Sequence, residues 1–211
     1  CFSKINNMNP LFKGKGIFMR LIYSIVAAFL LICSSSLNAQ SEAGAIFLLI
    51  SPGARAGGMG EAQVAVANDA YASYWNPAGL AFQEGSEIAI MHVNWLPNLA
   101  DDLYYEFLGF RRKFQNLGTL GGHLIYLNLG EQVRMDEYAQ YQGKFTSYMM
   151  AAAISYSSKL SSSSSFGMNA KISYQHLVEL GTGSEKGSGT STDFGFDLGY
   201  MKKGWLTPKL D

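Results

Sequence analysis

Apolar and polar residues alternate along much of the chain from about residue 86, and this period of two predicts β-strands with one apolar and one polar face. The clearest strand is predicted over residues 166–175. Its apolar face is formed by Phe166, Met168, Ala170, Ile172 and Tyr174. The same alternation predicts strands over 148–157 and 192–202. A less regular pattern predicts three more, over 87–95, 103–114 and 119–127, and we expect their second face to contact another part of the chain.

The connections between these strands differ in length. Short turns are predicted at 115–118, 159–164 and 203–208, and the serine run Ser161–Ser165 is interpreted as part of the second of them. Long polar loops are predicted at 128–145 and 180–191, and residues 96–102 form a connection of intermediate length. Short turns at one end and long loops at the other are typical of outer-membrane β-barrels, whose short turns lie on the periplasmic side.

A half-buried soluble sheet also alternates, so the period alone leaves two architectures open. Aromatic residues recur near the ends of the apolar faces, as they do in the aromatic girdles of membrane barrels. We therefore predict an all-β fold, a transmembrane antiparallel β-barrel, in which seven aromatic residues face lipid: Tyr148, Tyr156, Phe166, Tyr174, Phe194, Phe196 and Tyr200. The polar faces are rich in Gly, Ser and Ala and carry the single charges Lys171 and Asp197, which suits a lumen. The alternative is a secreted soluble β-sandwich.

The stretch from Ala45 to Phe82 has a different composition, dominated by small residues and turn formers. After an apolar run, Pro52 and Gly53 interrupt any regular element. Glycine-rich and alanine-rich segments follow, and the stretch ends at an Asn-Pro pair that indicates a sharp turn. Such a segment suits a plug inside a confined, hydrogen-bonding interior, and ordinary turns at the edge of a soluble domain are the alternative. The residues of this plug and turn motif are Arg55, Gly57, Gly58, Gly60, Asp69, Trp75, Asn76, Pro77 and Gly79.

Individual roles follow from the chemistry of these residues. Glycines permit a positive φ and a close approach of one backbone to another. Arg55 is expected to pair with Asp69 or with an acid of the lumen, because a charge in a narrow interior is costly unless it is partnered. The alternative is that Arg55 reaches the periplasm. Asn76 and Pro77 are expected to set the turn from the plug into the first strand, and Trp75 to pack beneath that turn.

The N-terminal part of the chain is read as a targeting sequence. From Met19, a basic residue, a twelve-residue apolar core (residues 21–32) and CSSSLNAQ predict a signal peptide over 19–39 that is cleaved between Ala39 and Gln40. A lipoprotein signal at Cys33 is the weaker alternative, because Ile32 stands where such a signal requires a small residue. Residues 1–18 are expected to be an upstream extension. The segments are therefore 1–18, 19–39, a plug at 40–85 and barrel strands over 86–211.

After cleavage, neither of the two cysteines remains, so a disulfide or a thiol nucleophile is not expected. Four of the 16 basic residues and none of the 16 acidic residues precede residue 40, which leaves a net charge of −4 and argues against nucleic-acid binding. The histidines His92, His123 and His176 show no ligand spacing. The acidic pairs Asp101–Asp102 and Asp136–Glu137 fall in predicted loops. We expect no metal, no cofactor and no enzymatic activity.

The run FLLISPGARAGGMGEAQVAVANDAYASYWNPAGLA, residues 47–81, resembles the N-terminal signature of the PorV/PorQ family of Bacteroidetes-type outer-membrane proteins. That family lies within the group similar to the FadL fatty-acid transporters. The resemblance is specific over about residues 41–95 and implies a plugged barrel of about fourteen strands. Six strands are predicted here, with a seventh beginning near Leu210, whereas a closed barrel needs at least eight. The chain is therefore expected to be the N-terminal part of a longer protein.

The resemblance also implies a function in the outer membrane of a Gram-negative bacterium. It implies a type IX secretion component that binds exported cargo proteins at the cell surface and passes them to the attachment machinery. The predicted outer loops at 128–145 and 180–191 would make these contacts, outer-membrane lipid would surround the barrel, and the plug would close the pore. A transporter of hydrophobic small molecules is the alternative that the wider group implies.

Overall fold

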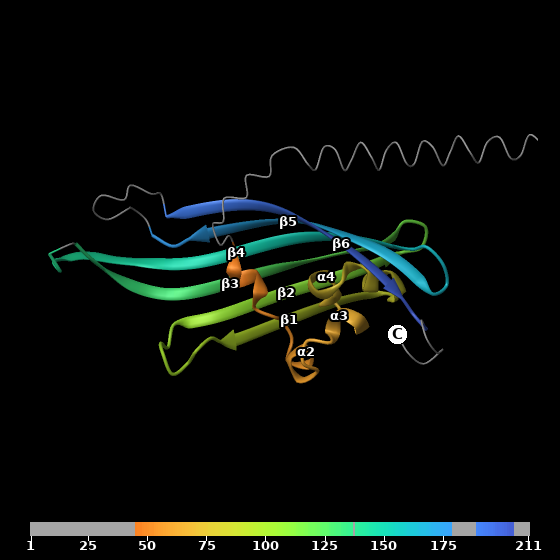
Figure 1. The fold of residues 1–211 in the computed structure, drawn as a ribbon, viewed down its shortest axis with the longest axis horizontal. Coiled ribbons are helices and arrows are strands. Elements are labelled where there is room, and N and C mark those ends of the chain that lie inside the picture. The colour runs from red at the N-terminus through yellow and green to blue at the C-terminus, as the bar shows by residue number, and fades with distance from the viewer. Residues whose placement is uncertain (1–44, 137, 179–188, 205–211) are drawn as a thin grey trace, which may run out of the picture. The chain divides into compact units, whose positions relative to one another are not determined.

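The computed structural model describes residues 45–136, 138–178 and 189–204 (Figure 1). The predicted extension at 1–18, the signal peptide at 19–39 and the possible strand near Leu210 lie outside these residues, as does most of the predicted loop at 180–191. In the part that is described, no helix is both long enough and apolar enough to cross a membrane.

Six antiparallel strands form one open sheet in the order β1-β2-β3-β4-β5-β6, so each strand pairs with its neighbours in sequence (Figure 1). The strands are β1 (Ser86–Asn94), β2 (Leu103–Phe114), β3 (Gly118–Met135), β4 (Tyr141–Lys159), β5 (Ser164–His176) and β6 (Thr190–Lys202). This arrangement confirms the predicted all-β class and all six predicted strands. It is the connectivity expected of part of an up-and-down barrel.

The predicted long loop at 128–145 is wrong. β3 continues to Met135 and β4 begins at Tyr141, so most of this stretch is a two-stranded hairpin that extends beyond the neighbouring strands (Figure 1). The pairing of β3 with β4 shifts between Asn128 and Glu131, and the Asp102 carboxylate accepts a hydrogen bond from the Glu131 amide at 2.7 Å. Alternation fails as a signal here because side chains on both sides of the extension are exposed or half-buried.

The two faces of the sheet have opposite surroundings. On the inner face, alternate residues such as Phe107, Ile125 and Ser157 are buried under the residues that precede β1. On the outer face, most of the intervening residues are exposed or half-buried, and Ile154 and Phe196 have 71% and 81% of their surface accessible. The two faces therefore follow the period of two in the sequence, which places alternate residues on opposite sides of a strand.

Residues 45–85, which we call the helical segment, fold as five short helices against the inner face (Figure 1). They are η1 (Ile46–Leu49), α2 (Ala54–Gly58), α3 (Gln63–Val66), α4 (Ala72–Trp75) and η2 (Pro77–Phe82). The sequence pattern indicated only breaks and turns in this stretch. Helices of four to six residues are too short for a period of 3.6 to be recognised, so local composition could not reveal them.

Candidate functional site

The contact between the helical segment and the inner face begins with an aromatic core. Phe47 of η1 is buried with Tyr105 and Phe107 of β2 and with Ile125 of β3. The ring of Tyr71 stacks on Phe107 with centroids 4.9 Å apart. The Tyr105 hydroxyl donates to the carbonyl of Ile50 at 3.2 Å. Buried apolar area and a satisfied hydroxyl together hold the start of the segment on the sheet.

The contact between residues 76–78 and the sheet depends on glycines in strands β5 and β6, which together with the other strands form the wall of the barrel. A Cβ added to Gly167 of β5 would lie 2.4 Å from the Ala78 nitrogen and the Pro77 carbonyl carbon, and one added to Gly199 of β6 would lie 2.4 Å from the Asn76 side-chain oxygen. Within the helical segment, a Cβ added to Gly79 would lie 2.2 Å from the Ala67 carbonyl oxygen, so the segment is itself closely packed. The segment therefore approaches the sheet at backbone distance, which residues with a Cβ do not allow.

The Asn76-Pro77 pair begins a helix where the helical segment contacts β5 and β6, whereas the sequence indicated only a turn. Asn76 caps η2, since its side-chain oxygen accepts from the Ala78 amide at 3.1 Å and Pro77 occupies the first turn. The Asn76 amide nitrogen donates to the carbonyls of Val64 and Tyr200, each at 3.3 Å. An asparagine cap followed by proline is a favourable helix start, and the same side chain links the segment to β6.

Arg55 and Asp69 do form an ion pair, with the nearest nitrogen and oxygen 3.2 Å apart. The Arg55 side chain is 50% exposed, so the pair lies at a solvated edge and contributes little to stability. Asp69 is more important as an acceptor within the segment, because it accepts from Gln63 Nε2 at 3.0 Å and from the Tyr71 amide at 3.1 Å. The expectation of a charge in a narrow interior does not describe Arg55.

Gly57, Gly58 and Gly60 do not make the close backbone approach expected of them. An added Cβ would meet no atom within 4 Å at any of the three, and only Gly60 has a positive φ, of 59°. Gly57 and Gly58 lie in the short helix α2. Close packing falls instead on strand glycines such as Gly167, which faces the helical segment, and on Gly79, which packs against Ala67 within that segment.

A polar network that the sequence did not reveal ties the segment to three strands. Ser73 of α4 lies 3.1 Å from Nδ1 of His123 on β3, and its carbonyl accepts from Asn169 Nδ2 of β5 at 2.7 Å. Asn169 also donates to Asp197 of β6 at 3.2 Å, and Asp197 pairs with Lys171 at 2.9 Å. The sequence indicated Lys171 and Asp197 as charges of the lumen, but only the strand register brings them together with Ser73, His123 and Asn169.

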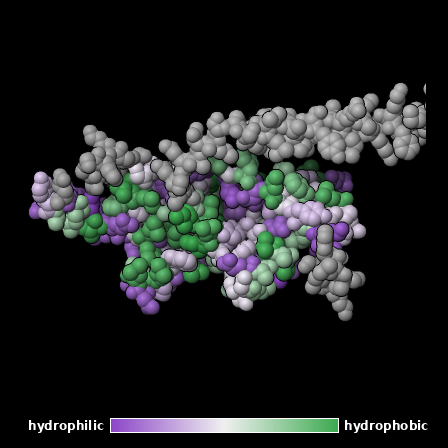
Figure 2. Space-filling view, viewed as in Figure 1, coloured by the Kyte–Doolittle hydropathy of each residue, from purple (hydrophilic) through white to green (hydrophobic). Residues whose placement is uncertain are grey.

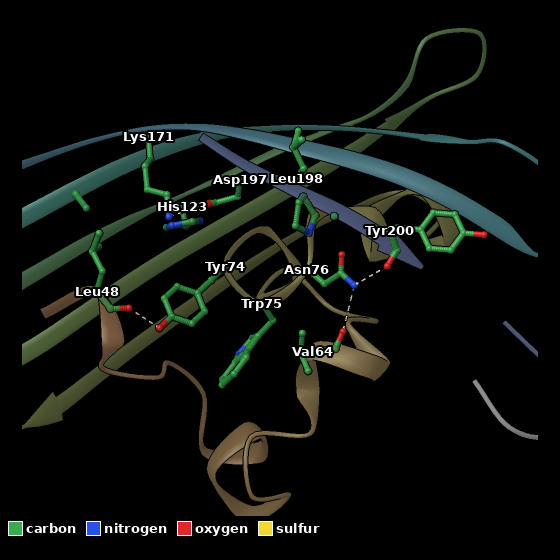
Figure 3. A pocket seen from close by; sticks show the side chains of 13 residues that line it. Leu48, Val64, Tyr74, Trp75, Asn76, His123, Lys171, Asp197, Leu198 and Tyr200 are labelled. Carbon is green, nitrogen blue, oxygen red and sulfur yellow. Dashed lines mark hydrogen bonds and ion pairs between the residues drawn. The ribbon is translucent and has the colours of Figure 1, made fainter. Parts of the chain in front are cut away.

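Beside this network lies a cavity of about 500 Å³ between the helical segment and the wall (Figure 3). Tyr74, Trp75 and His123 line it together with the Lys171–Asp197 pair. Burial, reinforced by the Glu61 charge and opposed by a hydrogen bond with Ser51, raises the pKa of Tyr74 to about 12. Its hydroxyl therefore stays protonated and donates to the Leu48 carbonyl at 2.7 Å, while the Trp75 indole donates to Pro52 at 3.2 Å.

The outer face carries all seven aromatic residues predicted to face lipid. Phe194, Phe196 and Tyr200 are exposed, and Tyr148, Tyr156, Phe166 and Tyr174 are half-buried by neighbouring strands. A row of rings crosses the face near the loop end, with centroids 5.2–6.1 Å apart: His92, Tyr104, Tyr126, Tyr148, Tyr174 and His176. We call it the tyrosine row. Figure 2, which views the molecule as in Figure 1, shows hydrophobic residues gathered over the strands and a more hydrophilic hairpin end.

Nothing in the described ranges resembles a metal centre, since no three His, Cys, Asp or Glu side chains there are placed to hold an ion. His92 and His176 belong to the tyrosine row, and His123 lies on the inner face. The adjacent acids Asp101 and Asp102 are exposed, and Asp102 accepts the Glu131 amide described above.

An antiparallel sheet with an apolar outer face, an aromatic row and a covered inner face defines part of an outer-membrane β-barrel. A family model described as type IX secretion system protein PorV matches residues 36–204. The chain belongs to this family and is an outer-membrane component of type IX secretion. The family is one of secretion components and is not a known enzyme family. Among curated proteins, the search finds no match.

Proposed function

We propose that this chain forms part of a plugged barrel that binds exported cargo proteins at the cell surface. The outer face contacts outer-membrane lipid, residues 40–85 include the plug that keeps the lumen shut, and the end of the β3–β4 hairpin contacts cargo. The opposite character of the two sheet faces supports this proposal most directly, because a lipid-exposed barrel over a filled lumen requires it.

The cargo contact is assigned to the hairpin tip because of its position and its side chains. Beyond the tyrosine row, β3 and β4 continue into a hairpin whose last residues expose apolar side chains. Val133, Met135, Tyr138 and Tyr141 are 52%, 50%, 78% and 61% exposed. Exposed apolar and aromatic side chains among polar residues on a projecting element are typical of a protein-binding surface. Handing of cargo to the attachment machinery remains part of the proposal, by resemblance to the family.

The alternative, transport of hydrophobic small molecules, would use the cavity beside Tyr74 and Trp75. Its lining includes His123 and the Lys171–Asp197 ion pair, and the space beside Gly57 and Gly60 has no wall within 4 Å. An apolar ligand site is lined mostly by hydrophobic side chains with few polar groups. The ion pair within the lining and the helical segment packed against the sheet therefore favour the secretion role over transport.

The test replaces Met135, Tyr138 and Tyr141 with serine in the full-length protein. We expect cargo bound at the cell surface to fall about tenfold or more, because exposed aromatic anchors dominate protein interfaces. The matched control replaces Leu96 and Leu99 with serine, since these are 54% and 74% exposed at the same end in the β1–β2 connection. Heat-modifiable migration checks that both variants fold. Equal cargo binding by the hairpin variant and the native protein would contradict the assignment.

A further inference from the structure

The extension of the β3–β4 hairpin leaves one edge of β3 without a neighbouring strand. β2 pairs with β3 only as far as Leu103 and Leu129, whereas β3 continues to Met135 (Figure 1). An unpaired strand edge presents a row of main-chain donors and acceptors that can pair with another extended chain. The last residues of β3 are therefore a place where a further strand could be added to the sheet.

Two hydrogen bonds show which main-chain groups face this edge. The Glu131 amide points away from β4, because it donates to the Asp102 carboxylate at 2.7 Å. The Asp136 amide points the other way and donates across the hairpin at 3.0 Å. Successive residues of an antiparallel strand alternate between the two sides, so the N–H and C=O groups of Val133 and Met135 lie on the Glu131 side. No described residue forms a hydrogen bond with them on that side.

The side chains at this edge are accessible as well. Val133 and Met135 are 52% and 50% exposed, and as residues two apart on one strand they point to the same face. A strand that pairs with the edge would bury part of both side chains while its own backbone fills the free donors and acceptors. Recognition by strand addition combines these contributions, since main-chain hydrogen bonds supply affinity and side-chain contacts supply specificity.

The charges around the edge favour a basic partner. The described residues beside it and in the adjoining β1–β2 connection include four acidic and two basic side chains: Asp101, Asp102, Glu131, Asp136, Arg134 and Lys144. Of the two bases, Lys144 is already paired with Glu131 at 2.5 Å. A second copy of this edge would bring like charges together, whereas a basic segment would complement them.

We propose that an extended, basic segment of the exported cargo pairs as an additional strand with the free edge of β3, at Val133 and Met135. This rests on the proposed function and specifies how the hairpin recognises cargo. The main-chain groups of the two residues bond to the segment, and their side chains pack against it. Because main-chain pairing does not require particular side chains, one edge accepts different cargo proteins, while the nearby acids disfavour segments of like charge.

The test removes one main-chain donor from the edge of the full-length protein in lipid nanodiscs. Val133→Pro deletes an N–H that faces away from β4, and an edge strand tolerates proline at such a position. Val133→Ala is the matched control, because it shortens the side chain and keeps the N–H. The probe is the purified exported protein that is most depleted from the surface of cells lacking the full-length protein. We expect its Kd to rise about tenfold or more with Val133→Pro, because an acceptor of the cargo is left unpaired, and by less than about threefold with Val133→Ala.

Amide hydrogen exchange gives a second measurement that needs no variant. In the native protein, exchange at Val133 and Met135 should slow when the cargo probe binds, because their amides become hydrogen-bonded. In Val133→Pro, retained protection at Tyr138 and Gln140 checks that the hairpin tip is intact. If the tip is lost in that variant, the exchange of the native edge amides decides the question alone.

The preference for a basic segment is tested by reversing one charge. We expect Asp101→Lys to raise the Kd of the same probe about threefold or more, because it places a like charge beside the segment. Asp193→Lys is the matched control, since Asp193 is an exposed acid at the same end of the sheet but on β6. Equal effects of the two variants would overturn the proposed charge complementarity.

The outcomes separate this proposal from the proposed function. Equal Kd values for Val133→Pro and Val133→Ala would overturn main-chain pairing, as would unchanged exchange of both edge amides in the complex. If the triple serine variant of the hairpin loses cargo while Val133→Pro binds it normally, strand addition fails and the proposed function stands. If neither variant changes cargo binding, the proposed function fails as well.

Discussion

Gly167 and Gly199 show how single residues decide the distance between the helical segment and the wall. Gly167 leaves room for the backbone of Pro77 and Ala78, and Gly199 leaves room for the Asn76 side-chain oxygen, each of which would lie 2.4 Å from an added Cβ. Both glycines lie in strands, where glycine weakens the strand and marks a close approach of another backbone. The loss of strand propensity is offset by the seating of η2, which buries Pro77, Ala78 and Leu80.

A valine in place of Gly167 should therefore displace the segment without unfolding the sheet. The added Cβ would overlap Pro77 and Ala78, so we expect destabilisation of the seated state by about 1–3 kcal/mol. Limited proteolysis of residues 45–85 in the full-length protein measures this as faster cleavage. Gly57→Ala is the matched control, because its Cβ meets no atom within 4 Å and its cleavage rate should not rise. Equal cleavage rates for Gly167→Val and the native protein would contradict the proposed packing of η2 against Gly167.

Among the elements, the β3–β4 hairpin is held by a polar tip as well as by its strand pairing. The Asp136 carboxylate accepts from the amides of Tyr138 and Gln140 at 2.9 and 2.8 Å and from the Gln142 side chain at 2.9 Å. These donors, led by the Gln140 amide, lower the pKa of Asp136 below its ordinary value of 3.8. The exposed tip is thus ordered by local hydrogen bonds and not by burial.

Because the folded pKa of Asp136 is lowered, its contribution to the tip is complete above the ordinary pKa of 3.8 and is lost as the pH falls through the lower folded value. We expect amide hydrogen exchange at Tyr138 and Gln140, corrected for intrinsic rates, to lose protection below about pH 3.8. In Asp136→Asn, which keeps an acceptor oxygen but does not titrate, protection should be independent of pH over this range. If hydrogen-exchange protection in the native protein does not depend on pH, the Asp136 carboxylate does not order the tip.

The elements also show what a single sequence can predict. The strands over 148–157, 166–175 and 192–202 were recognisable because one face is covered and the other is apolar, so alternation is imposed on every residue. The extension of the β3–β4 hairpin was not predicted because neither of its faces is covered, and its strands pair through main-chain hydrogen bonds. The helices between residues 46 and 82 escaped because each is about one turn long and is stabilised by the sheet beneath it.

At the scale of the whole molecule, the two faces of the sheet have different surroundings. The inner face accommodates the helical segment through an aromatic core, through glycines and serines, and through the Asn169–Asp197–Lys171 network. The other side presents apolar residues and the tyrosine row. The sequence indicated both the apolar face and the plug, but not the residues that join them, because Ser73, His123 and Asn169 meet only through the strand register.

The central claim is that the outer face touches acyl chains while the inner face is covered by residues 45–85. Single spin labels at residues 168–173 of β5, in the full-length protein in a bilayer, test it through collisions with oxygen and with a water-soluble nickel complex. We predict high oxygen and low nickel accessibility at Met168, Ala170 and Ile172, and low oxygen accessibility at Asn169, Lys171 and Ser173. Outer positions that are shielded from both reagents would mean that a second layer of protein covers this face, which would contradict the account.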